Sequence, residues 1–121
     1  MLKRATRSYF LALRASARFG RAVKLRDAGK KEEALQVARE TLAILSHPHV
    51  VRSNPAEASV LACATVLLER LAHELKVPGA AQRDIVDALA VIRSMGPAGE
   101  FAEWLPYLEH RATQVAGNNA A

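Results

Sequence analysis

The sequence has little of what disulfide-rich, sheet-forming or membrane-spanning proteins depend on. Its 121 residues include one cysteine, Cys63, which excludes an internal disulfide and makes a reducing compartment the default expectation. Aromatic residues make up 5% of the chain, and apolar β-branched residues do not alternate with polar ones, so the pattern predicts no sheet. The longest uncharged run covers only residues 58–68, whereas a transmembrane helix needs about 20 apolar residues. We expect this run to be a buried helix.

Residue groupings that catalyse reactions or bind metals are also missing. His47 and His49 flank a proline with no cysteine or carboxylate cluster beside them, so we interpret them as loop histidines. Glu69 and His73 are spaced for acid–base chemistry on one helix, but such a pair is usually a surface contact. The sequence therefore predicts no catalytic residue, no metal site and no cofactor, and we expect a protein that is not an enzyme.

What the sequence does contain is helical periodicity. Good helix formers such as Ala, Leu, Arg and Glu predominate. Apolar residues recur at helical spacing in five segments: 3–28, 31–46, 55–76, 80–95 and 100–115. Asn54 and Glu57 are predicted to cap the third helix, with Pro55 at its first position. Pro106 predicts a kink or restart in the fifth. We expect one domain over residues 1–116 and a disordered tail over 117–121.

Charge is concentrated at one end of the chain. Residues 1–31 hold ten Lys or Arg and one Asp, a balance of +9, whereas residues 32–121 carry −4. On the first predicted helix, Tyr9, Leu13 and Val23 share one side, which we expect to face the core. The opposite side is a basic stripe made of Lys3, Arg4, Arg7, Arg14, Arg18 and Arg21.

This stripe is the most informative feature of the sequence for function. Basic helices attract acidic protein surfaces, phosphate backbones and anionic membranes, or they simply face solvent. We expect Arg7, Arg14, Arg18, Arg21 and Phe19 to contact an acidic partner protein. A basic peripheral membrane- or nucleic-acid-associated protein is an alternative, although no nucleic-acid-binding motif supports it. We expect cytoplasmic localisation, with organellar import through the basic N-terminal segment as the alternative.

The chain also shows an internal similarity at an offset of fifty residues. Four residues, Ala22, Leu25, Gly29 and Ala38, match Ala72, Leu75, Gly79 and Ala88. Chance in an alanine- and leucine-rich chain is one explanation, and two tandem helical hairpins, which the matching glycine turns favour, are the other. We predict an all-α fold of two antiparallel hairpins plus a C-terminal capping helix, either a repeat-like array or an irregular bundle.

Residues 15–45 resemble a tetratricopeptide repeat. In the stretch 25–35, a glycine turn is followed by a basic residue and then by Glu-Ala-Leu, as is common in that family. Ala22, Ala34 and Ala38 fall where the family packs small residues between its helices. The second hairpin starts later than the family's period of about 34 residues allows.

The resemblance implies a helical-repeat protein that binds peptides or proteins on a concave face. Some members clamp a C-terminal carboxylate, but Phe19 and Val23 stand at two of the clamp positions, so no clamp residue carries over. The sequence thus favours a non-catalytic protein-binding or adaptor module. A small immunity-type inhibitor of a toxin or enzyme is a further alternative.

Overall fold

The computed structural model describes the backbone of residues 2–120 and the side chains of residues 7–114. Over that part of the chain it contains five α-helices and no strand. The helices are α1 (Leu2–Asp27), α2 (Lys31–Leu45), α3 (Pro55–Leu75), α4 (Gln82–Met95) and α5 (Glu100–Ala120). The all-α class and the number of helices agree with the sequence prediction, and the boundaries at the turns differ by one or two residues.

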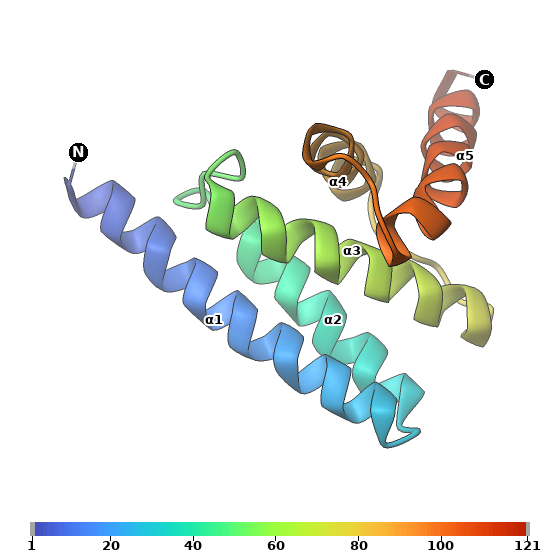
Figure 1. Ribbon diagram of the computed structural model, residues 1–121, viewed down its shortest axis with the longest axis horizontal. Coiled ribbons are helices and arrows are strands. Elements are labelled where there is room, and N and C mark those ends of the chain that lie inside the picture. The colour runs from blue at the N-terminus through green and yellow to red at the C-terminus, as the bar shows by residue number, and fades with distance from the viewer. Residues whose placement is uncertain (1, 121) are drawn as a thin grey trace.

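The helices form two tandem helix pairs and a closing helix: α1 and α2 are an antiparallel hairpin, and α4 crosses α3 at a steep angle (Figure 1). α1 packs on α2, α3 packs on α4, and α5 packs on α4. α3 contacts α1, α2 and α4, so it is the central helix of the fold. The chain therefore has the predicted arrangement, in which each helix packs on the next helix in the sequence.

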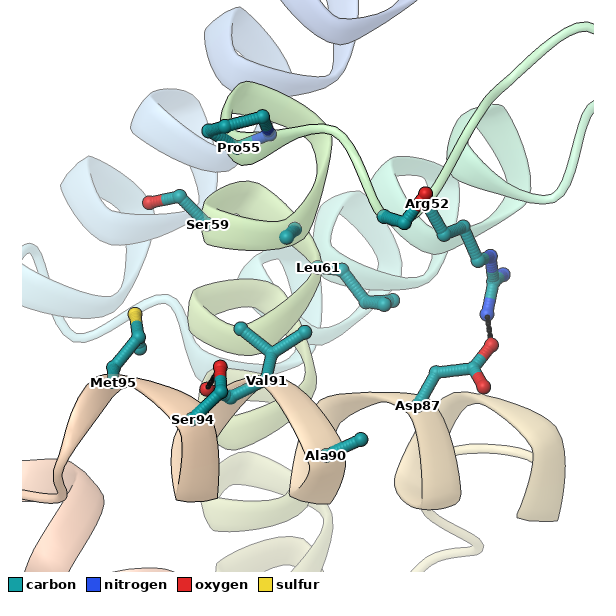
Figure 2. Close-up of a pocket in the computed structure, with 11 residues that line it drawn as sticks. Arg52, Pro55, Ser59, Leu61, Asp87, Ala90, Val91, Ser94 and Met95 are labelled. Atoms are coloured by element: carbon teal, nitrogen blue, oxygen red, sulfur yellow. Dashed lines mark hydrogen bonds and ion pairs between the residues drawn. The ribbon is translucent and has the colours of Figure 1, made fainter.

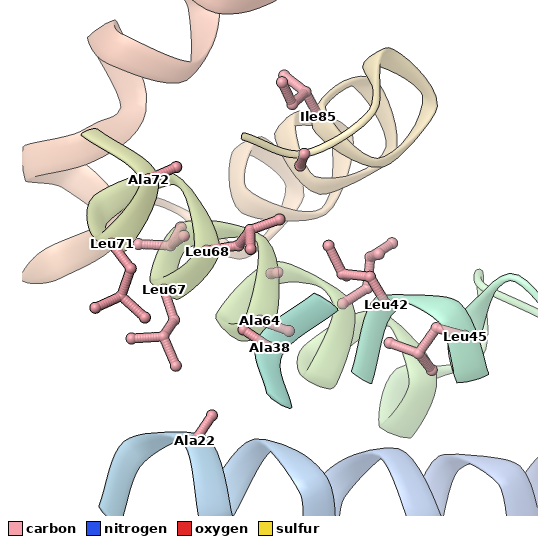
Figure 3. Packing of buried hydrophobic residues seen from close by; sticks show 14 of the residues in the cluster. Ala22, Ala38, Leu42, Leu45, Ala64, Leu67, Leu68, Leu71, Ala72 and Ile85 are labelled. Carbon is pink, nitrogen blue, oxygen red and sulfur yellow. The ribbon is translucent and has the colours of Figure 1, made fainter. Parts of the chain in front are cut away.

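The core lies where α3 meets its neighbours, and large aliphatic side chains fill it (Figure 3). Leu67, Leu68 and Leu71 of α3 are at most 2% exposed, and Leu45 of α2 and Ile85 of α4 are equally buried. Full burial of such a side chain stabilises the folded state by about 1.5–3 kcal/mol. This pairing of leucine-rich faces fixes α2 and α4 on α3.

α1 meets the core through small side chains, which corrects the sequence prediction. Ser8, Ala12, Ala15 and Ala22 are buried, whereas the predicted core residue Leu13 is 49% exposed. Small side chains let the α1 backbone approach α2 and α3 closely, and Figure 3 shows Ala22 pointing toward the core. The side of α1 that we expected to be buried is therefore largely its outer face.

Local sequence signals set the two sharpest boundaries. Gly29 adopts a positive φ of 81°, and the amides of Gly29 and Lys30 bond to the carbonyls of Arg26 and Leu25, which is a Schellman motif. The predicted cap of α3 is wrong in detail, because the side chain of Asn54 makes no capping hydrogen bond. Glu57 instead accepts a hydrogen bond from Ser8 Oγ at 2.8 Å, which joins α1 to α3.

The C-terminal helix differs from expectation around Pro106. α5 is one helix that contains Pro106, so no restart occurs there. Its backbone is helical to Ala120, and the side chains of residues 115–121 lie outside the described residues. The predicted disordered tail over 117–121 therefore lies outside the described side chains, and residue 121 lies outside the described backbone as well.

Candidate binding surface

The outer face of α1 carries an unusual combination of exposed side chains. Tyr9, Phe10 and Leu13 are 55%, 59% and 49% exposed, and they lie within about one turn of helix. The exposed arginines Arg14 and Arg21 share this face. We call Arg7, Tyr9, Phe10, Leu13, Arg14 and Arg21 the α1 surface.

The arginines of the α1 surface are almost free of carboxylate partners. Arg14 and Arg21 make no hydrogen bond or ion pair with any residue whose side chain is described. Arg7 Nη1 lies 3.3 Å from His49 Nε2, and the ring of His49 stacks on that of His47 at 5.0 Å. The two histidines thus border the same surface, and its positive charge is not neutralised within the described part of the chain.

A shallow hollow of about 410 Å³ lies at the end of the α1 surface. It is lined by Arg7, Phe10, Leu11, Arg14, His47 and His49. An exposed aromatic ring between two guanidinium groups offers apolar contact and charge to the same ligand. Such a combination is typical of residues that dominate protein interfaces.

Two of the residues predicted to bind a partner do not belong to this surface. Arg18 Nη1 lies 3.8 Å from Glu40 Oε2, so Arg18 forms an ion pair with α2. Phe19 is half-buried and packs against the core. It lines a separate cleft of about 220 Å³ with residues of α3 and α5, such as Cys63 and Phe101.

Phe10 was missed by the sequence prediction, although a signal for it exists. Residues three or four apart are neighbours on a helix surface. Arg7, Phe10 and Arg14 have this spacing, so Phe10 belongs to the basic stripe. Tyr9 and Leu13 were predicted as core residues because they are large and apolar.

A second concave surface separates the N-terminal half of α3 from α4 (Figure 2). This groove has a volume of about 650 Å³ and is mostly apolar, with Pro55, Leu61, Val91 and Met95 among its walls. Asp87 at one end is paired with Arg52, and Ser94 Oγ donates to the carbonyl of Val91. The groove is thus bordered by an ion pair at one end and by a hydroxyl that is bonded to its own helix.

Arg52 joins the two helix pairs and was not singled out by the sequence prediction. Its guanidinium donates to Asp84 Oδ1 at 2.7 Å and to Asp87 Oδ2 at 2.8 Å. It also donates to the carbonyl of Leu45 and to Ser46 Oγ at the end of α2. Because these partners lie at the end of α2 and on α4, Arg52 holds the connector between α2 and α3 against α4.

The Glu69 and His73 pair is not an acid–base pair in the structure. Glu69 is 1% exposed and accepts hydrogen bonds from the amide of Ala80 and from Arg111. His73 packs edge-to-face on Trp104 and Tyr107. The prediction that this pair is a surface contact is therefore wrong for Glu69, which is a buried structural carboxylate.

Burial also perturbs the one thiol. Desolvation, with a smaller contribution from the nearby carboxylate of Glu100, raises the pKa of Cys63 above its ordinary value. A raised pKa keeps the group in its unreactive thiol form near neutral pH.

Among residues 7–114, no three His, Cys, Asp or Glu side chains lie together in a group that could hold a metal ion. None of the described helices is long and apolar enough to cross a membrane. Comparison with models of known protein families, with curated proteins and with solved structures found no match to this chain. The resemblance to tetratricopeptide repeats therefore stays a prediction from the sequence.

Proposed function

We propose that this protein is a non-catalytic binding module that docks an acidic partner protein on the α1 surface. One observation carries the proposal: Tyr9, Phe10 and Leu13 stand exposed beside arginines that lack carboxylate partners. A helix that only faced solvent would have no reason to expose three large apolar side chains together. A partner that covered them would remove apolar area from water while its carboxylates paired with the arginines.

The composition of the α1 surface favours a protein over a mere solvated face. Protein interfaces are enriched in Tyr, Phe and Arg and depleted of Lys and Glu. Three of the six side chains of the α1 surface are arginines and two are aromatic, and exposed Lys24 follows on the same face one turn beyond Arg21. We expect the aromatic side chains to form the buried centre of the contact and the arginines to give it orientation and a fast association rate.

The fold supports docking by holding α1 in a fixed orientation. Buried Ala15 and Ala22 pack α1 on the core, and Ser8 bonds to the Glu57 carboxylate. The α1 surface is thus preorganised, so little conformational entropy is lost when a partner binds. The positive charge of residues 1–31 contrasts with the negative charge of residues 32–121. We therefore expect an acidic partner to approach the protein from the side of α1.

The proposal can be tested by affinity capture from the source cells with matched variants. Arg14→Gln/Arg21→Gln removes two charges from the α1 surface, and Lys30→Gln/Arg83→Gln removes two exposed charges elsewhere. Phe10→Ser is matched by Val86→Ser, because Val86 is also exposed, on α4. We expect a protein that is captured by wild type and both controls to be reduced by about tenfold with either α1 variant.

Capture of the same proteins by all variants would overturn the proposal. Sedimentation with phosphatidylserine vesicles provides the second arm, because basic helices with aromatic side chains also bind anionic membranes. Vesicle binding that depends on Phe10 and Arg14, without capture of a protein, would replace the acidic protein by a membrane. Circular dichroism of each variant establishes that the fold is intact.

A further inference from the structure

A polar pocket lies at the other end of the fold from the hollow beside Phe10. The C-terminal end of α3, the loop before α4 and the middle of α5 enclose a volume of about 570 Å³. This size falls within the range of small-molecule sites. Its polar lining side chains are Glu69, His73, Lys76, Tyr107 and Arg111.

The only carboxylate in this lining is already neutralised. Glu69 Oε1 accepts a hydrogen bond from the amide of Ala80 at 2.9 Å, and Glu69 Oε2 accepts one from Arg111 Nε at 3.2 Å. A side chain at Gly79 would place its Cβ 2.5 Å from Glu69 Oε1, so the glycine lets the loop close over this carboxylate. Glu69 therefore forms the floor of the pocket and leaves no free negative charge there.

The remaining lining groups are hydrogen-bond donors that no described residue of the protein uses, and two of them, His73 and Lys76, are exposed. Lys76 makes no hydrogen bond or ion pair with any described residue. Arg111 Nη2 donates to Glu69 Oε1 and to the carbonyl of Ala80, whereas Arg111 Nη1 has no partner within that part of the chain. The hydroxyl of Tyr107 and the ring nitrogens of His73 likewise have no hydrogen bond there. Burial raises the pKa of Tyr107, and the carboxylate of Glu69 adds to this, so the phenol stays a donor at neutral pH.

The backbone presents Lys76 at the rim of the pocket. Lys76 has a φ of 57°, the only positive φ among the non-glycine residues of the described chain. A left-handed residue ends α3 and turns the chain into the loop. Lys76 thus lines the same pocket as Arg111, which comes from α5.

We propose that this pocket binds a phosphomonoester group. A phosphomonoester carries a charge of about −1.5 to −2 near neutral pH and offers three terminal oxygens as acceptors. Lys76 supplies a positive charge that no carboxylate of the lining takes up, Arg111 Nη1 adds a charge-assisted donor, and Tyr107 and His73 supply neutral donors. A carboxylate, with one charge and two oxygens, would use fewer of these donors.

The chain contains its own reporter for a titration. Trp104 is the only tryptophan, and its ring lies 5.0 Å from that of Tyr107 and 6.3 Å from that of His73. Glycerol 3-phosphate and inorganic phosphate are titrated at constant ionic strength, with acetate as the control anion, because surface charges are screened by salt. We expect a saturable change in Trp104 emission with both phosphates, and calorimetry measures the same binding independently of fluorescence.

Matched variants decide whether the pocket is responsible. Lys76→Gln and Tyr107→Phe are expected to weaken phosphate binding, Lys76→Gln by about tenfold because it removes a charge-assisted hydrogen bond. Lys30→Gln removes an exposed charge outside the pocket and is expected to leave binding unchanged. Arg111 is left intact because it neutralises buried Glu69.

A vesicle arm separates the two sources of a phosphomonoester. Binding of glycerol 3-phosphate in solution supports a soluble ligand, and Lys76-dependent binding of phosphatidic acid vesicles alone supports a lipid headgroup. The proposal is overturned if neither phosphate source binds by fluorescence or calorimetry, if acetate binds equally well, or if Lys76→Gln binds like wild type.

Discussion

At the scale of single residues, the fold places three carboxylates in its interior and gives each a partner. Glu57 accepts a hydrogen bond from Ser8, Asp84 from Arg52, and Glu69 from Arg111. A buried charge without such a partner costs several kcal/mol. These pairs join residues 32 to 49 positions apart, so no spacing rule could have predicted them from the sequence.

The pairing of Glu69 can be tested by removing its partner. Arg111→Gln leaves the carboxylate of Glu69 buried with only the Ala80 amide, so we expect the free energy of unfolding to fall by roughly 3 kcal/mol. Arg93→Gln breaks the exposed pair with Glu109 and is expected to cost less than about 0.5 kcal/mol. Urea denaturation measures both, and equal losses would contradict a structural role for Glu69.

Cys63 makes a prediction about pH. Its pKa is raised by burial, so the folded state holds the thiol proton more tightly than the unfolded state. The free energy of unfolding should therefore fall as the pH rises from the ordinary thiol value of about 8.5 through the raised value. Alkylation by iodoacetamide at pH 8 should be several-fold slower than in urea-unfolded protein. Equal rates would show that the thiol is accessible and unperturbed.

At the scale of elements, periodicity predicted every helix but not the orientation of α1. Leucine-rich α2, α3 and α4 bury the residues that are largest and most apolar, so their faces could be predicted from the sequence. α1 packs through alanines, and the sequence does not distinguish a buried alanine from an exposed one. Tyr9 and Leu13 therefore looked like core residues, and the apolar part of the α1 surface was missed.

The packing of α1 can be tested with two alanines of the same helix. Ala22 is fully buried, whereas Ala17 is exposed. Ala22→Leu forces a larger side chain between α1 and the core and should destabilise the fold by about 1–3 kcal/mol. Ala17→Leu should change stability by less than about 0.5 kcal/mol. Thermal unfolding followed by circular dichroism distinguishes them, and the reverse order would restore the orientation predicted from the sequence.

At the scale of the whole molecule, the two helix pairs depend on the connector between them. Arg52 links the end of α2 to Asp84 and Asp87 of α4, and the amide of Val51 donates to Ser8 Oγ of α1. The sequence predicts this connector as irregular, because no local pattern reveals which distant side chains it meets. The turn after α1 could be predicted from Gly29, whereas after α3 the left-handed position is taken by Lys76 and not by the predicted Gly79. The docking of the two helix pairs could not be predicted.

Removing Arg52 tests this coupling. Arg52→Gln leaves buried Asp84 without its cation, so we expect a loss of roughly 3 kcal/mol in the free energy of unfolding. Asp87 is more exposed than Asp84, so Asp87→Asn should cost less. Urea denaturation followed by circular dichroism measures both variants. A loss for Arg52→Gln no larger than that for Asp87→Asn would contradict the role given to Arg52.

The central claim is that the α1 surface is where this protein meets an acidic partner protein. Site-specific photocrosslinking in the source cells tests it most directly, with p-benzoylphenylalanine placed at Phe10 or, as a control, at Val86. We expect a discrete protein adduct from position 10 that is absent from position 86 and is lost when Arg14→Gln/Arg21→Gln is added. Identical adducts at both positions, or no protein adduct at position 10, would contradict the account.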